Sequence, residues 1–473
     1  MGPGYPGMKV GRREFIGRSG ACLLGAAAGF VLGSPWAARP AAWARQAAAP
    51  AGPGFGPLRP DPDGYLDLPE GFSYKIISWS GTRMNDGFIV PSLADGMAAY
   101  PGPAGSTIIL RNHEFRFGHS ASLGPFGSEA KLWTKLDRGL IYDWTPDGAP
   151  CLGSVTTIVY DTRQKRTKSQ HLSLAGTMTN CSGGATLWGT WLSCEEVFAN
   201  PGSACQGRHG YTFEVAVSAE PKITVPVPLT AMGRFVKEGI AADPRTRVLY
   251  QTEDQPDGLF YRFLPAAAGR LAEGGRLQAL AVTGTPGLET NNWRIQKIAP
   301  GTSFAVHWID LDDPDPAEDV LRFRGRETGA AVFASGEGII YREGAIWFAC
   351  TNGGTGAKGQ IWRYDPSPDE GMPSETKRPG RLSLVLEPND PGVMERPDQI
   401  GAAPWGDLFV CEDGDGDQYL LGLTARGEIY KFARNALDTS ELAGVCFSPD
   451  RTTMFLNNLY SGLTFAVTGP WKK

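Results

Sequence analysis

Histidine is scarce in this sequence. The histidines are His113, His119, His171, His209 and His307. They are too scattered along the chain to predict a three-histidine metal site. Two further motifs are absent. The stretch around Ser335 lacks the G-x-S-x-G pattern of a nucleophile elbow, and the acidic run from Asp413 has Thr424 where an EF-hand needs a glutamate. The sequence therefore does not predict a three-histidine metal site, a serine hydrolase with a nucleophile elbow, or an EF-hand.

Positive charge is also in short supply. The chain has 45 Lys and Arg against 50 Asp and Glu, a net charge of −5. Residues 1–44 carry five basic residues and one acidic residue, so their removal would lower the net charge to −9. Because an acidic surface repels polyanions, we predict no nucleic-acid partner. An anionic substrate would need bound cations to reverse the local field.

No apolar run is long and continuous enough to predict a stable membrane anchor. The run at 19–38 is interrupted by glycines and by Pro35. It follows the pair Arg12-Arg13 and precedes Ala42-Trp43-Ala44, which is the order of a twin-arginine signal peptide with an A-x-A cleavage site. We therefore predict a signal peptide at 1–44, export by the twin-arginine machinery, and a periplasmic or secreted mature protein.

Cleavage would also remove Cys22 and leave seven cysteines, an odd number. In an oxidising compartment at least one cysteine then has no disulfide partner within the chain. Cys181 is our candidate for that exception. The other six could form up to three disulfides or none.

Glycine and proline are abundant, with 62 and 37 residues, which favours short strands and tight turns. Apolar strands followed by a polar or acidic tip recur along the chain. They are expected at 107–111, 187–193, 247–250, 345–350, 407–411 and 454–456. This spacing predicts an all-β fold, a six-bladed β-propeller with insertions and a few short helices, whose equivalent strand ends meet around one mouth. We expect a flexible linker at 45–60 and a single propeller domain at 61–473.

One stretch, residues 180–196, combines the strongest chemical signals. It reads as a glycine-rich turn that carries Cys181, then a strand at 187–194 that ends in the pair Glu195-Glu196. A thiolate together with carboxylates suits a transition metal, whereas carboxylates alone suit calcium. The alternative is a buried cysteine in a core strand, followed by two solvated glutamates.

The sequence also resembles a known family, the PhoX-type alkaline phosphatases and their wider relatives. The matching segments are Asn112-His113-Glu114, the stretch 180–196, and residues 210–215, 233–239, 257–263, 337–339, 397–398 and 446–450. They span most of the mature chain in order.

This resemblance implies a six-bladed propeller with an axial cluster of two oxide-bridged irons and calcium ions alongside. Cys181 resembles the iron-binding cysteine of the family. Glu196, Glu238 and Glu337 resemble its metal-binding glutamates, and Glu114 and Asp398 stand in matching motifs. In such a cluster the cations polarise a phosphoryl oxygen and supply a metal-bound oxygen as the nucleophile.

The sequence departs from the family pattern at two positions. Relatives usually have an arginine that contacts phosphate just before the glutamate matching Glu337, whereas this chain has Ala334-Ser335-Gly336. The residue before Glu238 is often histidine in relatives and is Lys237 here. Lys237 would either supply the lost positive charge or face solvent, as most lysines do.

Together these features predict an exported, monomeric, metal-dependent hydrolase with iron and calcium, most simply a phosphomonoesterase acting on a small phosphoester. Two alternatives stay open. One is a related propeller hydrolase of another ester or lactone, and the other is a non-catalytic propeller whose acidic tips hold structural calcium.

Overall fold

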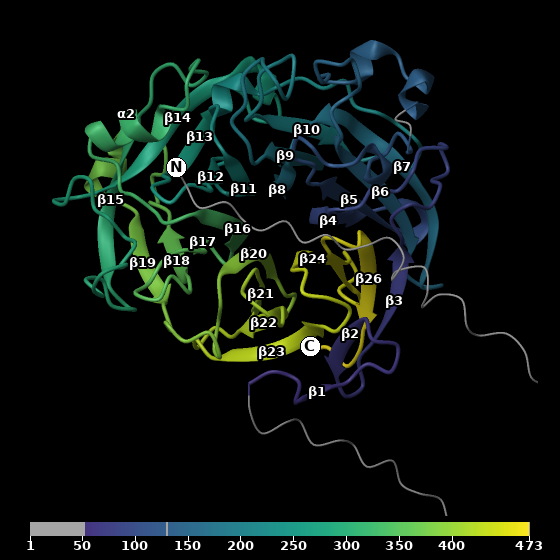
Figure 1. Ribbon diagram of the computed structural model, residues 1–473. Helices are drawn as coiled ribbons and strands as arrows, with labels where there is room; N and C mark the ends of the chain where they lie inside the picture. Colours follow the sequence, from purple (N-terminus) through teal and green to yellow (C-terminus); the bar gives the residue numbers. More distant parts are fainter. Residues whose placement is uncertain (1–52, 129–130, 473) are drawn as a thin grey trace, which may run out of the picture. The chain divides into compact units, whose positions relative to one another are not determined.

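A computed structural model describes residues 53–128 and 131–472 of the chain. The predicted signal peptide at 1–44 lies outside these residues. In the described part the strands form separate antiparallel sheets arranged around a common centre (Figure 1), which confirms an all-β, propeller-like fold. No helix in the described ranges is long and apolar enough to cross a membrane.

Three of the sheets consist mainly of strands that are consecutive in the sequence. The first contains β4 (Ala94–Pro101), β5 (Thr107–His113), β6 (Gly153–Asp161) and β7 (Arg166–Thr177). The second contains β8 (Asn180–Ala185), β9 (Thr190–Glu195) and β10 (Thr212–Ala216). The last contains β24 (Leu442–Phe447), β25 (Met454–Asn458), β26 (Leu463–Thr468) and, from the other end of the chain, β3 (Ser73–Ser78).

The other two sheets are larger. One orders its strands as β20 (Pro397–Ala402), β21 (Leu408–Glu412), β22 (Tyr419–Leu423), β23 (Ile429–Asn435), β2 (Leu66–Pro69) and β1 (Leu58–Arg59). The nine-stranded sheet runs β11 (Lys237–Ala242), β12 (Leu249–Glu253), β13 (Phe260–Pro265), β14 (Gly275–Val282), β15 (Ser303–Asp310), β19 (Arg381–Leu386), β18 (Gln360–Asp365), β17 (Ala345–Cys350) and β16 (Gly336–Arg342).

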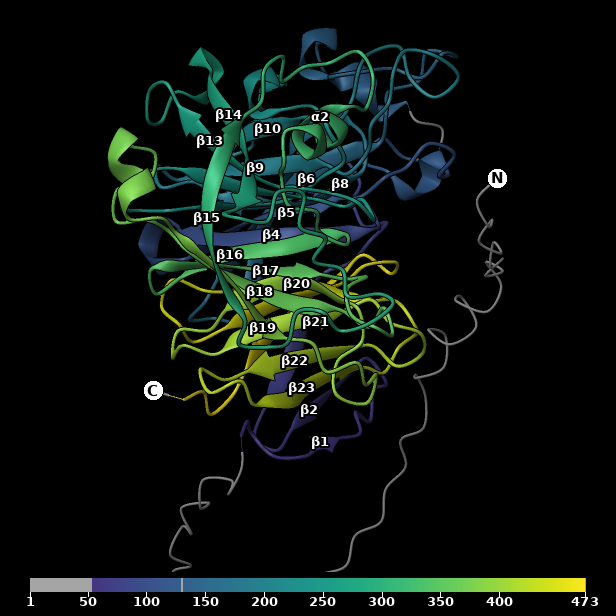
Figure 2. The same cartoon turned by 90° about the vertical axis from the view of Figure 1, so that its left-hand side faces the viewer.

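The long strand β15 joins two sets of strands, because it pairs with β14 on one side and with β19 on the other (Figure 2). For this reason the sheets alone do not give the predicted number of six blades, and that number remains a prediction. Helical structure is limited to short 3-10 turns and to α2 (Leu321–Glu327) within the described residues.

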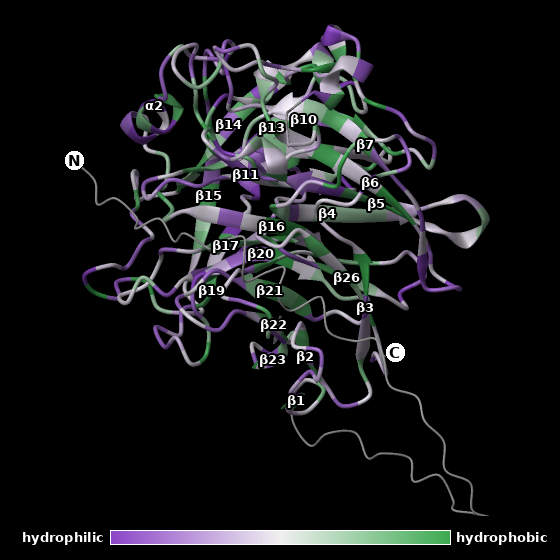
Figure 3. Ribbon diagram, turned by 45° about the vertical axis from the view of Figure 1, so that its right-hand side comes forward, coloured by the Kyte–Doolittle hydropathy of each residue, from purple (hydrophilic) through white to green (hydrophobic). Residues whose placement is uncertain are grey.

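The strands contain many hydrophobic segments, while many connecting loops are hydrophilic (Figure 3). In the largest buried cluster Phe260 of β13 stacks on Phe348 of β17, with ring centroids 4.4 Å apart. Aromatic and β-branched residues favour such pleated, buried surfaces. The strand predicted at 345–350 coincides with β17.

Two local predictions were wrong. Residues 180–185 form strand β8 rather than a glycine-rich turn, and the turn lies at 186–189. Near the amino-terminal end, the segment predicted as a flexible linker ends earlier than residue 60. Phe55 packs edge-on against Phe72 and Tyr430, and β1 pairs with β2, so residues from 55 onward belong to the folded unit.

The innermost strands of the sheets contact one another in a closed cycle. The order is β4, β8, β11, β16, β20, β24 and back to β4 (Figure 1). Because each of these strands starts near the same mouth, residues at their first positions come together from distant parts of the sequence. This cycle positions the candidate metal centre.

Candidate metal centre

Each predicted ligand on an inner strand lies at the second residue of that strand. Cys181 is second in β8, Glu238 in β11, Glu337 in β16 and Asp398 in β20. At each of these points the pairing with the neighbouring strand shifts register over the next residues. A β-bulge of this kind bends a strand and redirects a side chain. The repeated irregularity therefore turns the ligands inward.

Glycines next to the ligands allow the inner strands to approach closely. A Cβ on Gly338 would lie 2.5 Å from the Cα of Gln399, and a Cβ on Gly96 would lie 2.8 Å from the Cα of Ser182. No side chain fits at such distances without a backbone shift. Glycine at these positions thus permits the close approach of neighbouring inner strands that brings the predicted ligands together.

The structure brings most of the predicted ligands into two overlapping groups. Potential ligand atoms of Cys181, Glu196 and Glu238 lie within 4.8 Å of one another, and so do those of Glu238, Glu337 and Asp398. Glu238 belongs to both groups. Glu114, just after β5, faces the same centre, because its charge acts on Glu196 and on Asp398. Residues from distant parts of the sequence therefore come together at the starts of the inner strands.

The carboxylates in this centre are buried without enough positive charge. Both carboxylate oxygens of Glu238 and the Oδ1 atom of Asp398 are buried and have no hydrogen-bond partner. Burial and then neighbouring carboxylates raise the pKa values of Glu238 and Glu337 well above their usual range. The same causes act on Glu196, and they raise the pKa of Asp398 to about 6. Unpaired buried carboxylates are costly, so this arrangement indicates a cation site.

The thiol of Cys181 belongs to the same electrostatic cluster. Burial and the charges of Asp95 and Glu238 raise its pKa well above the usual range. The side-chain amide of Asn112 donates to the backbone oxygens of Cys181 and Ser182, at 3.1 and 2.6 Å, and so fixes the strand that carries the thiol. The alternative of solvated glutamates after the core strand is wrong, because the side chains of Glu195 and Glu196 are only 0% and 10% exposed.

Sequence reasoning missed Asp95, which is the second residue of β4 and lies in the same type of bulge as the other ligands. Burial, followed by the charges of Glu114 and Asp398, raises its pKa well above the usual range. A signal was present in the sequence: Asp95-Gly96 repeats the acid-glycine pair of Glu238-Gly239 and Glu337-Gly338. Glu441, directly before β24, is a second carboxylate of this centre that was missed.

Two basic residues near the inner strands differ in their placement. Lys237 does not fit the predicted phosphate contact, because its buried Nζ atom donates to Met232 O at 3.0 Å and to Gln251 Oε1 at 2.8 Å. Burial lowers the pKa of this amine to about 7. By contrast, the guanidinium of Arg116 lies 2.8 Å from Glu114 and 3.4 Å from Glu196, and its side chain is 64% exposed. Arg116 therefore lies exposed beside the centre, with its Nε and Nη2 atoms engaged by Glu114 and Glu196.

Comparison with known proteins places the chain in context. The family model described as alkaline phosphatase PhoX matches residues 53–131 and 159–462. The structure of Pseudomonas fluorescens PhoX with vanadate, a transition state analogue, is 18% identical, with a TM-score of 0.64 over 86% of this chain and 96% of that chain. This likeness supports the propeller-like fold.

Other solved structures resemble the chain more weakly. A gluconolactonase from Xanthomonas campestris is 10% identical, covering 88% of this chain and 98% of its own, with a TM-score of 0.40. A virginiamycin B lyase from Staphylococcus aureus is 13% identical, covering 84% and 99%, with a TM-score of 0.36. These scores are too low to support an argument about function. No match was found among curated protein sequences.

Proposed function

Because the chain belongs to the alkaline phosphatase PhoX family and is a phosphatase, we propose that it is an exported phosphomonoesterase with an iron–calcium cluster at the inner strand ends. The observation that carries the proposal is Glu238, whose two oxygens are buried and unpartnered and whose side chain belongs to both groups of potential ligands. Dividing the nine-stranded sheet at β15 would give six blades, one for each inner strand of the closed cycle.

The donor set fits a mixed metal cluster. A buried thiol at Cys181 suits iron, and the carboxylates of Glu196, Glu238, Glu337 and Asp398 suit iron and calcium. Asp95, Glu114 and Glu441 place further carboxyl groups near the same strand ends. When bound, these metal ions would act as Lewis acids on a phosphoryl oxygen.

The residues of the chain would orient the substrate through Arg116. In this chain the segment before Glu337 carries Ser335, whose hydroxyl accepts a bond from Asn352 Nδ2 at 2.8 Å, and the segment itself contributes no guanidinium. Arg116 approaches from the opposite sheet, where Glu114 holds its Nε atom at 2.9 Å. A guanidinium held in this way would present its remaining donors to phosphate oxygens. We propose that Arg116 takes the place of the missing arginine.

A second candidate function is the hydrolysis of another small ester or lactone. The specific observation in its favour is the absence of arginine before Glu337. Both candidates place the protein in the periplasm or outside the cell, as a monomer exported by the twin-arginine route, and both use the same carboxylates.

The test is to purify the exported full-length protein, to measure its iron and calcium content, and to assay phosphomonoester hydrolysis before and after chelation. Glu238→Gln should remove most of the metal and the activity, whereas Glu220→Gln, at an exposed carboxylate, should change neither. Full metal loading of Glu238→Gln would refute the proposed ligand set. A metal-loaded wild-type protein that cleaves lactones but no phosphomonoester would establish the second candidate.

A further inference from the structure

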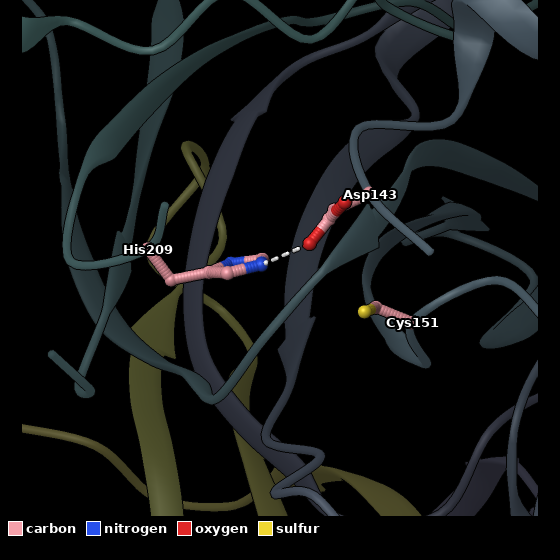
Figure 4. A group of neighbouring side chains, drawn as sticks. All are labelled: Asp143, Cys151 and His209. Carbon is pink, nitrogen blue, oxygen red and sulfur yellow. Dashed lines mark hydrogen bonds and ion pairs between the residues drawn. The ribbon is translucent and has the colours of Figure 1, made fainter. Parts of the chain in front are cut away.

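A second group of buried ligating side chains lies apart from the centre described above. Asp143, Cys151 and His209 are all buried, and one potential ligand atom of each lies within 4.8 Å of the others. Their side chains converge on one point (Figure 4). Asp143 and Cys151 close a small loop, in which the Cys151 amide donates to Asp143 O at 3.0 Å. Both residues fall within 132–158, which the family model does not match.

Hydrogen bonds fix the orientation of the His209 ring. Its Nδ1 atom lies 2.7 Å from Glu195 Oε1, and its Nε2 atom lies 2.9 Å from Asp143 Oδ2. The Glu195 carboxylate also accepts the backbone amides of Met178, Gly210 and Tyr211, at 3.0, 2.9 and 3.2 Å. Glu195 is therefore fully engaged in holding the Nδ1 side of the ring. In metal sites a carboxylate typically holds one ring nitrogen of a histidine in this way, and the other nitrogen, here Nε2, faces the remaining ligands.

We propose that Asp143, Cys151 and His209 bind a single zinc-type divalent metal ion, separate from the iron–calcium centre. One thiolate, one imidazole and one carboxylate are the ligand types that zinc prefers. Cys205 packs in the same buried cluster as Cys151, and its thiol lies within hydrogen-bonding reach of the His209 ring. The sulfur atom of Cys205 is therefore our candidate for the fourth ligand of the ion.

The charges of this group suit replacement of protons by a metal ion. Each nitrogen of the buried His209 ring has a carboxylate oxygen within hydrogen-bonding distance, and the buried thiol of Cys151 lies beside the Nε2 side of the ring. A metal ion would displace the proton from Nε2 and the proton from the Cys151 sulfur, and both protons would pass to solvent. Cys151 also lines an open hollow of about 360 Å³, which gives an ion a route to the site.

Strand β9 connects the two sites. Its last residue, Glu195, holds His209, while the next residue, Glu196, belongs to the centre around Glu238. The adjacent carboxylates point to opposite sides because side chains alternate along extended chain. Each site therefore has its own carboxylate, and one can be tested without removing a ligand of the other.

The experiment measures zinc, iron and calcium in the intact purified protein and in two variants, Cys151→Ser and Asp143→Asn. We expect one zinc per chain in the wild type, its loss in both variants, and unchanged iron and calcium. Cys181→Ser should show the reverse pattern, with iron lost and zinc kept. This contrast separates failure of the new site from failure of the proposed phosphatase centre.

Cobalt substitution gives a second readout that does not depend on activity. Cobalt bound to the wild type should show a thiolate-to-metal charge-transfer band, which Cys151→Ser should lack and which Cys411→Ser, at a buried thiol elsewhere, should keep. Absence of zinc and of cobalt binding from the wild type would overturn the proposal. So would a Cys151–Cys205 disulfide found by peptide mass spectrometry, or a cobalt band that survives both Cys151→Ser and Asp143→Asn.

Discussion

Removal of the proposed metal ions should make the stability of this protein fall as the pH rises, and Asp398 allows the size of the effect to be worked out. Burial, and then the charges of Glu114 and Asp254, raise the pKa of Asp398 from 3.8 to about 6. A group with a raised folded-state pKa stabilises the fold below its unfolded pKa, and that stabilisation is lost as the pH rises through the folded pKa. At ~1.4 kcal/mol for each pH unit, the shift at Asp398 corresponds to about 3 kcal/mol.

The perturbation is Asp398→Asn in protein stripped of metal by chelation. Asparagine does not titrate, so the variant should escape the loss between pH 4 and pH 7. It should be more stable than the metal-free wild type at pH 7 by up to about 3 kcal/mol. Raised pKa values at Glu238 and Glu337 act in the same direction in both proteins. In the presence of metal the order should reverse, because the variant lacks a ligand.

The assay is urea unfolding of wild type, Asp398→Asn and the control Asp63→Asn, at an exposed position, from pH 4 to pH 8 with and without chelator. The free energy of unfolding of the metal-free wild type should fall with pH, and that of Asp63→Asn should follow it. The free energy of unfolding of metal-free Asp398→Asn should depend less on pH than that of the wild type. If the two slopes are equal, or if the metal-free wild type becomes more stable as the pH rises, the Asp398 carboxylate does not destabilise the metal-free fold.

Three further predictions follow from the site and the ring. Arg116→Met should raise KM for a phosphomonoester by about 10- to 100-fold, the value of lost hydrogen bonds to a charged group. Lys237→Met should leave KM unchanged, and an equal effect of both variants in steady-state kinetics would refute the assignment. Gly338→Ala should lower the free energy of unfolding by about 1–3 kcal/mol because its Cβ meets Gln399. Thermal unfolding would contradict this if Gly139→Ala, which meets no atom within 4 Å, were equally destabilised. Cys181→Ser should lose iron but keep its circular dichroism spectrum, and retained iron would show that the thiol is not a ligand.

Much of the fold could be predicted from the sequence because its strands are strongly apolar and end in polar tips. The strand at 345–350 was placed correctly for this reason. By contrast, β22 (Tyr419–Leu423), which pairs with β21 on one side and β23 on the other, was not among the expected strands. Its sequence follows an acidic loop and shows little alternation, so local pattern alone did not reveal it.

The candidate centre was predicted in part. Cys181, Glu238, Glu337 and Asp398 were identified through the family resemblance, and the structure brings them together. Asp95 was missed because it lies at the start of a strand that was not expected. The placement of Lys237 also could not be read from the sequence, since the register shift after it decides which way each neighbouring side chain points.

The strand that completes the last sheet has a consequence for the order of events in the cell. β3 (Ser73–Ser78) pairs with β26 (Leu463–Thr468), so this early segment of the chain can pair only after a segment far later in the sequence has been synthesised. Asp398 and Glu441 also emerge late from the ribosome. Since inner strands from both ends of the chain form the centre, ions cannot be gathered by a half-made polypeptide. Loading of the proposed metal ions would therefore follow the synthesis of both segments, and metal-free protein would precede the first turnover.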